Sequence, residues 1–119
     1  MITGELDENR PYITVPIRWA GRVQEIPVLI DTGFDGDIRI SRKEAEDLKL
    51  IFDHSQRFEF ADGSKKDVPG SIGYSECNGV INSVNIAILD GQAMIGMGFL
   101  EKFSAILTIN LKQKSVTIS

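Results

Sequence analysis

The feature that most constrains this chain is the point at which an apolar segment runs directly into an acidic turn. Residues 28–30 are Val, Leu and Ile, which are typical of strands, and Asp31-Thr32-Gly33 follows them without a break. Aspartate and glycine are typical turn residues, and glycine adopts backbone angles that other residues avoid. The pattern predicts a carboxylate held at the edge of a hydrophobic core.

The turn alone has a purely structural explanation, because Asp31 can accept hydrogen bonds from the backbone N–H groups that follow it. A later segment changes this assessment. Residues 93–100 also run from apolar residues into glycine, at Ile95-Gly96, and continue into Phe99-Leu100. Together the two segments resemble the retropepsin-like aspartic proteases, in which an apolar strand leads into Asp-Thr-Gly and a later apolar-apolar-Gly segment leads into a short helix.

This resemblance covers residues 12–118 and implies an all-β fold, a retropepsin-like closed β-barrel with one or two short helices. The Asp-Thr-Gly-Phe sequence is similar to that of small, single-domain prokaryotic relatives, whereas retroviral enzymes commonly have Asp-Thr-Gly-Ala. The chain has 119 residues, which predicts one domain, 1–119, large enough to form its own core.

The resemblance also implies a reaction. Aspartic proteases hydrolyse peptide bonds with two carboxyl groups that share one proton. Because this chain has a single Asp-Thr-Gly, the resemblance implies a homodimer in which Asp31 of one copy faces Asp31 of the other across a two-fold axis. The expected activity is that of an aspartic endopeptidase acting on a peptide or protein substrate, and no metal or cofactor is implied.

Residue roles follow from the same resemblance. Thr32 would hydrogen-bond across the two-fold axis, and Gly33 would let the backbone carry the acid without a Cβ clash. Ile95 and Gly96 would pack beside the turn. The residues that would bind an extended peptide or line its pockets are Phe34, Asp35, Ile38, Phe60, Ala61, Asp62 and Gly63.

The last of these residues lie in a predicted hairpin. Residues 57–61 alternate between polar and apolar side chains, Asp62-Gly63-Ser64 is a turn signal, and residues 65–74 can return as the second arm. By its order in the chain the hairpin resembles the flap that closes over bound peptide in these proteases. An ordinary surface hairpin would have the same local structure, so the sequence leaves both interpretations open.

The rest of the chain also predicts mainly strands. A hairpin is expected over residues 12–19 and 23–30, and residues 1–10 are expected to fray or form an edge. Ser41 and Glu44 have the spacing of a capping box, which predicts a helix over 41–50. The other expected elements are strands over 38–40, 72–77 and 80–89, a turn at Asn78-Gly79, a short helix over 99–104 and a terminal hairpin formed by 105–110 and 114–119.

Composition disfavours several other functions. The net charge is −4 and Lys and Arg are not clustered, which disfavours nucleic-acid binding. The sequence has no apolar run long enough to span a membrane and no signal-peptide pattern, so a cytoplasmic location is expected. Cys77 has no partner for an internal disulfide and is interpreted as an ordinary strand residue. A calcium loop starting at Asp35 fails because the third ligand position is Arg39.

Three functions therefore remain in competition. The first is a homodimeric aspartic endopeptidase. The second is a non-catalytic peptide-binding or dimerisation module of the same fold, in which Asp31 serves mainly its own turn. The third is an unrelated small β-barrel with a chance Asp-Thr-Gly, which would place Ile95-Gly96 far from Asp31.

Overall fold

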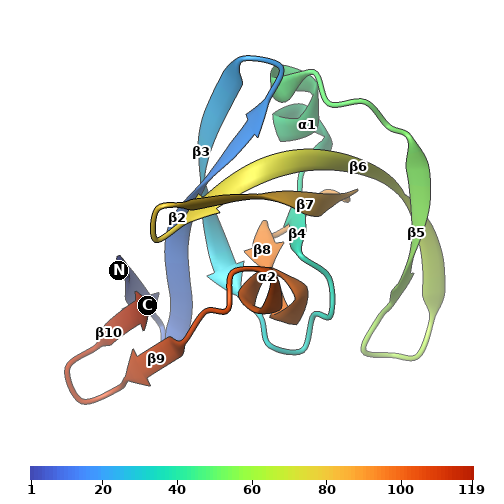
Figure 1. The fold of residues 1–119 in the computed structure, drawn as a ribbon. Coiled ribbons are helices and arrows are strands. Elements are labelled where there is room, and N and C mark those ends of the chain that lie inside the picture. Colours follow the sequence, from blue (N-terminus) through green and yellow to red (C-terminus); the bar gives the residue numbers. More distant parts are fainter.

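The chain forms ten strands and two short helices (Figure 1). Most of the strands coincide with apolar segments of the sequence, and turns separate them. The computed structural model describes residues 1–119. The elements are β1 (Ile2–Asp7), β2 (Arg10–Trp19), β3 (Arg22–Ile30), β4 (Ile38–Ile40), α1 (Arg42–Leu48), β5 (His54–Glu59), β6 (Lys65–Cys77), β7 (Val80–Ile88), β8 (Met94–Ile95), α2 (Met97–Lys102), β9 (Leu107–Asn110) and β10 (Ser115–Ile118).

The pairing of these strands closes a ring. Neighbours run in the order β6-β7-β4-β8-β3-β2, and β2 returns to β6 where Ile17 lies opposite Ser75 and Arg18 lies opposite Tyr74. β5 extends the sheet beyond β6, while β1, β10 and β9 extend it beyond β2. The predicted all-β class with two short helices is confirmed.

The core lies inside this ring and follows the two-residue period of the strands. On β2, for example, Ile13, Val15 and Ile17 are buried while the residues between them are more exposed. Phe99 of α2 is fully buried, and its ring centroid lies 4.7 Å from that of Phe103. Each such large apolar side chain contributes about 1.5–3 kcal/mol through burial, so the alternating strands stabilise the ring collectively.

Two tight turns join neighbouring strands through residues with positive φ. Asn78 and Gly79 have φ values of 52° and 82° and join β6 to β7, as their sequence predicts. Ala20 and Gly21 have φ values of 49° and 80° and join β2 to β3. Residues 65–77 form one continuous strand, where the sequence suggested two overlapping segments.

The expectation that residues 1–10 fray or form an edge is wrong. β1 lies between two strands, with Glu5 opposite Tyr12 of β2 and Ile2 opposite Ile118 of β10. The turn at residues 8–9 has positive φ at both positions and folds β1 back on β2. Ile2 and Leu6 then pack against the core, which local sequence could not reveal because β10 is at the other end of the chain.

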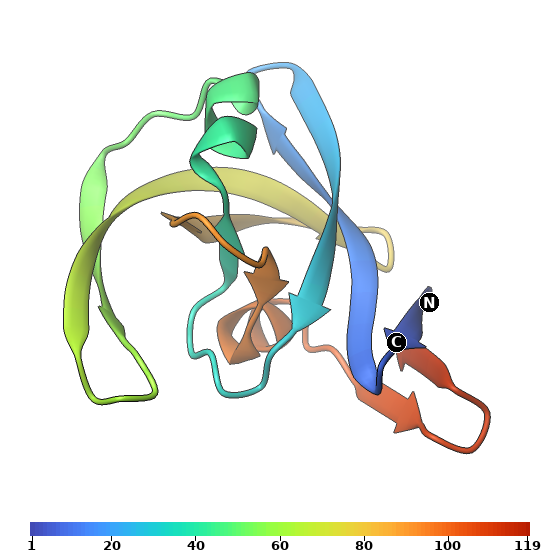
Figure 2. The ribbon, with the colours of Figure 1, turned by 180° about the vertical axis from the view of Figure 1, so that it is seen from behind.

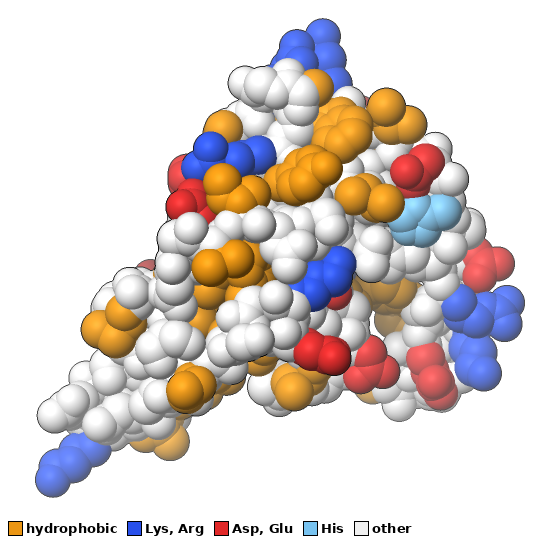
Figure 3. All heavy atoms as spheres, in the orientation of Figure 1, with side chains coloured by type: hydrophobic (Ala, Val, Ile, Leu, Met, Phe, Trp, Pro, Cys, Tyr) orange, Lys and Arg blue, Asp and Glu red, His pale blue; other side chains and the backbone are white.

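The molecular surface carries exposed apolar side chains on one side of β6, where Ile72 and Tyr74 are 39% and 45% exposed. Figure 3 shows hydrophobic side chains gathered on this face.

Cys77, at the end of the same strand, is buried, and burial raises the pKa of its thiol. Neither helix is long and apolar enough to cross a membrane.

Helix α1 begins with the predicted capping box. The Ser41 hydroxyl accepts a hydrogen bond from the Glu44 N–H at 3.1 Å, and the Glu44 carboxylate accepts one from the Ser41 N–H at 2.9 Å. The helix ends at Leu48, earlier than the predicted boundary, because Lys49 adopts a left-handed conformation with φ 55°. Ala45 and Leu48 of this helix are buried in the core.

Replacing the cap residue should therefore destabilise the fold locally. We expect Ser41→Ala to lower the free energy of unfolding in urea by about 1 kcal/mol, because the Glu44 N–H loses its partner. Ser55→Ala is the control, since Ser55 is exposed on β5, away from any helix end. Equal stability of the two variants would contradict the capping role.

Candidate active site

Asp31 stands immediately after β3, where the chain leaves the core. Ile30 is 5% exposed, whereas Asp31 is partly exposed. The Asp31 N–H donates to the Ile95 carbonyl at 3.0 Å, and the Phe34 N–H donates to the Asp31 carbonyl at 3.1 Å, which closes the turn. The Asp31 Oδ1 accepts the Gly33 N–H at 2.9 Å. The rest of the carboxylate remains available to a ligand or a second chain.

The segment after β8 is hydrogen-bonded to the backbone of this turn. The N–H groups of Gly96, Met97 and Gly98 donate to carbonyls of the turn, at 3.1 Å to Asp37, 2.8 Å to Phe34 and 3.1 Å to both residues 35 and 36. A Cβ at Gly96 would overlap the Phe34 and Gly36 carbonyl oxygens, so the approach requires glycine. The structure thus places Ile95 and Gly96 beside Asp31, and the hypothesis of an unrelated barrel is wrong.

A groove of about 550 Å³ opens in front of the Asp31 carboxylate. The turn forms one wall and the β5–β6 hairpin forms the other; both lie at the same edge of the molecule (Figure 1, Figure 2). Six residues of the predicted site line this groove: Asp31, Gly33, Phe34, Asp35, Phe60 and Ala61. Four lining residues were missed by sequence reasoning: Arg39, Phe58, Glu59 and Met94.

A row of aromatic rings connects the turn to the hairpin. The ring centroids of Phe34 and Phe58 are 5.4 Å apart, and those of Phe58 and Phe60 are 6.4 Å apart. Tilted aromatic pairs at such distances contribute about 0.5–1.5 kcal/mol beyond their burial. The signal for Phe58 was available in the sequence, because it lies two residues before Phe60 and so shares its face of the strand.

Other predicted site residues do not line the groove. Asp62 and Gly63 form the tip of the hairpin, where the Asp62 carboxylate binds Ser64. Ile38 is fully buried in the core, so its expected place in a pocket is wrong. On β4 the side chains alternate, which turns Ile38 inward and Arg39 toward the groove. Thr32 faces a separate hollow beside α2.

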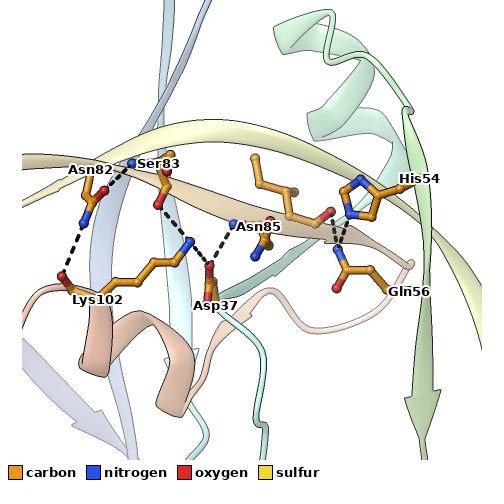
Figure 4. A network of polar contacts seen from close by, with 8 residues as sticks. Asp37, His54, Gln56, Asn82, Ser83, Asn85 and Lys102 are labelled. Atoms are coloured by element: carbon orange, nitrogen blue, oxygen red, sulfur yellow. Dashed lines mark hydrogen bonds and ion pairs between the residues drawn. The ribbon is translucent and has the colours of Figure 1, made fainter.

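The turn is also fixed by a buried acid, Asp37, which is 7% exposed. Its Oδ2 lies 2.8 Å from Lys102 Nζ and accepts the Asn85 N–H at 2.8 Å (Figure 4). Lys102 Nζ also donates to the Ser83 carbonyl at 3.1 Å. The ion pair therefore joins the turn to both α2 and β7. Sequence reasoning missed Lys102 because no local pattern links it to Asp37.

The hairpin is anchored at its base by Gln56, whose Nε2 donates to the Ile86 carbonyl of β7 at 3.2 Å (Figure 4). The hydrogen bonds at its tip lie within the turn, such as the Phe60 N–H donating to the Ser64 carbonyl at 2.8 Å. The acids near the turn do not gather as a metal site: the structure has no group of three or more His, Cys, Asp or Glu side chains placed to hold an ion.

Comparison with solved structures identifies the fold as retropepsin-like. A retropepsin-like aspartic protease from Rickettsia conorii aligns with 99% of this chain and 88% of its own, with a TM-score of 0.68 and 16% identity. EIAV protease complexed with the inhibitor HBY-793 aligns over 85% of this chain and 94% of its own, with a TM-score of 0.61 and 18% identity. No protein-family model and no curated protein matches the sequence. At these identities the likeness establishes the fold.

The hairpin tip provides a pH-dependent test of its geometry. Hydrogen bonds from the Ser64 hydroxyl and N–H lower the pKa of Asp62 from its ordinary value. The ionised Asp62 carboxylate therefore stabilises the tip fully at neutral pH. This stabilisation is lost as the pH falls through the lowered pKa. We expect Ser64→Ala to raise the pKa of Asp62 in an NMR titration. An unchanged pKa would show that the hydroxyl does not bind the carboxylate in solution.

Proposed function

We propose that this protein is an aspartic endopeptidase that acts as a homodimer, with one Asp31 carboxyl supplied by each copy. The observation that carries the proposal is the partly exposed Asp31 carboxylate, which stands at the end of a buried strand and opens on a groove lined by Phe34, Phe58 and Phe60. The retropepsin-like fold supports a protease function.

The chemistry requires two carboxyl groups that hold one proton between them. Like charges held close together separate their titrations, so one group stays ionised while the other stays protonated. The ionised carboxyl removes a proton from water as its oxygen attacks the peptide carbonyl carbon, and the protonated carboxyl donates to the carbonyl oxygen. A proton then passes to the leaving nitrogen as the C–N bond breaks. Neither group has a pKa of its own in such a pair.

Within one chain, Asp31 is the acid placed for this role. Asp37 is engaged by Lys102 and the Asn85 N–H, so it is not available to the groove. A second copy related by a two-fold axis supplies an identical Asp31, because an isologous contact places the same residue on both sides. In this arrangement Gly33 lets the backbone carry the acid without a Cβ clash, and Thr32 hydrogen-bonds across the axis.

The face beside Thr32 supports a second copy as the partner. The hollow there is about 700 Å³ and is lined by Thr32 together with Met97, Leu100 and Leu107. Met97 is 47% exposed, and Ile106, next to β9, is 65% exposed. A second chain covering this face would remove apolar surface from water while bringing its own Asp-Thr-Gly turn to the axis.

Substrate binding follows from the shape and lining of the groove. An extended peptide can pair with strand edges through its main chain while its side chains enter pockets on alternate sides. Phe34 and the hairpin residues Phe60 and Ala61 supply apolar contacts, and Asp35 lies among them as a polar contact. Asp62 and Gly63 would approach the peptide when the hairpin closes over it and excludes water.

A specific observation favours the alternative, a non-catalytic module of the same fold. Asp31 Oδ1 accepts the Gly33 N–H at 2.9 Å, which is the bond that would retain an aspartate for its turn alone. Such a module would bind peptide in the groove without cleaving it. The two functions differ in one measurable property, the cleavage of a peptide bond.

Asp31→Asn separates the two functions, because asparagine keeps the oxygen that accepts the Gly33 N–H but cannot titrate. We expect native protein to cleave a denatured protein substrate between about pH 4 and 7, and the variant to lose about a thousandfold or more of kcat/KM while keeping its Tm. Asp7→Asn, at an exposed position of β1, is the matched control. A native dimer without cleavage would leave only the binding module, and equal cleavage by native protein and the Asp31→Asn variant would show that Asp31 is not the catalytic acid.

The dimer interface has its own test at Met97. We expect Met97→Glu to weaken self-association in sedimentation by at least about tenfold, because the two-fold contact would bury unpaired charge. Cleavage should fall with it and recover at higher protein concentration. Val23→Glu is the control, since Val23 is 53% exposed next to the β2–β3 turn. A native chain that stays monomeric at all concentrations contradicts the proposed dimer.

A further inference from the structure

We infer that Arg39 is a specificity residue of the groove, and that the groove selects peptides with an acidic side chain at the position that meets it. The inference rests on the proposed function, since it assigns a substrate class to the same groove. Neither turn motif contains Arg39, and in the sequence its one evident effect is to disfavour a calcium loop.

The Arg39 side chain is fixed in place by the loop after β7. Its Nε donates to the Leu89 carbonyl at 3.2 Å, and its Nη2 donates to the Asp90 carbonyl at 2.6 Å. A Cβ at Gly91 would overlap this Nη2, so the loop closes tightly around the guanidinium. A guanidinium has five N–H donors in a planar fork, and these two bonds leave the Nη1 edge for a ligand.

Arg39 also lacks a counter-charge. The arginines that form ion pairs are Arg18, with Glu76 at 2.9 Å, and Arg57, with Asp67 at 3.3 Å. No carboxylate of the chain lies within 4.0 Å of the Arg39 guanidinium, although its residue is only partly exposed. A partly desolvated and unpaired arginine favours a ligand carboxylate, because charge-assisted bonds to the planar fork are strong.

The position of Arg39 brings such a ligand close to the chemistry. Arg39 lies opposite Met94 on the neighbouring strand β8, and Met94 in turn lies beside Leu29 of β3, two residues before Asp31. Arg39, Met94 and Asp31 line one groove. A peptide whose carboxylate binds Arg39 therefore has its backbone in the same groove as the Asp31 carboxyl.

The other charges of the groove restrict this preference to one position. Asp35 and Glu59 line the same groove and carry negative charge, so an acidic side chain is repelled where it faces them. Arg39 is the cation among the residues that line this groove, and Arg57 and Lys65 line the adjoining hollow beside Asp35 and Glu59. The charge pattern therefore favours an acidic side chain at Arg39 over one that faces Asp35 or Glu59.

A purely structural role for Arg39 would be to hold the loop at residues 89–91. That role predicts that removing the guanidinium lowers the Tm and weakens the binding of all peptides alike. Selection of an acidic side chain predicts a change in the ratio between two matched peptides. The ratio of their affinities for one protein is therefore the decisive quantity.

The test measures binding in the Asp31→Asn variant, so that it does not depend on cleavage. The probes are two randomised octapeptide libraries that differ only in one fixed central residue, Glu or Gln, and their Kd values are measured by fluorescence anisotropy. With Arg39 present we expect the Glu library to bind about tenfold more tightly. Adding Arg39→Gln should bring the ratio to about one, and Arg39→Lys should retain part of it because the charge remains.

Arg22→Gln is the matched control, because it removes the same charge from an exposed position at the distant β2–β3 turn. It should leave the ratio at its native value. Equal affinity for the two libraries, a ratio that survives Arg39→Gln, or no binding of either library at millimolar concentration would each overturn the role of Arg39. Failure of the protease proposal appears separately, as absence of Asp31-dependent cleavage, and leaves this ratio measurable.

Discussion

The site depends on the close approach of two backbone segments far apart in the sequence. N–H groups from Asp31 and from residues 96–98 bridge the turn and the segment after β8, and Gly96 permits the approach because a Cβ there would meet carbonyl oxygens. These bonds satisfy backbone groups that would otherwise be buried without partners. They also fix the point at which Asp31 leaves the core. The position of the groove is therefore set by backbone hydrogen bonds rather than by side-chain packing.

The ion pair between buried Asp37 and partly exposed Lys102 completes this support. Two charges removed from water lose much of their solvation, and their attraction offsets that cost only when the remaining hydrogen-bonding groups are satisfied. The Asn85 N–H and the Ser83 carbonyl meet this need. The pair therefore holds α2 and β7 against the turn in one arrangement, and removing Lys102 would leave the buried Asp37 carboxylate without its counter-charge.

The groove joins a rigid element to a less restrained one. The turn is fixed by the backbone bonds and by the Asp37 pair, whereas the hairpin tip is held by its own turn and by the aromatic row of Phe34, Phe58 and Phe60. A hairpin anchored at its base and linked by apolar contacts can move without breaking strong bonds. On the proposed function, this division lets the carboxylates stay in place while the peptide enters and leaves.

The sequence by itself determined the features that rest on neighbouring residues: the Asp-Thr-Gly turn after an apolar strand, the capping box at Ser41, the Asn78-Gly79 turn and the alternation of buried positions. These depend on interactions within a few residues, so one segment contains all their information. Only the tertiary structure decided the pairing of β1 with β10, the burial of Ile38 with Arg39 turned to the groove, and the engagement of Asp37 by Lys102. Each of these depends on a partner distant in the chain, whose position is set by closure of the sheet and by packing of the whole core.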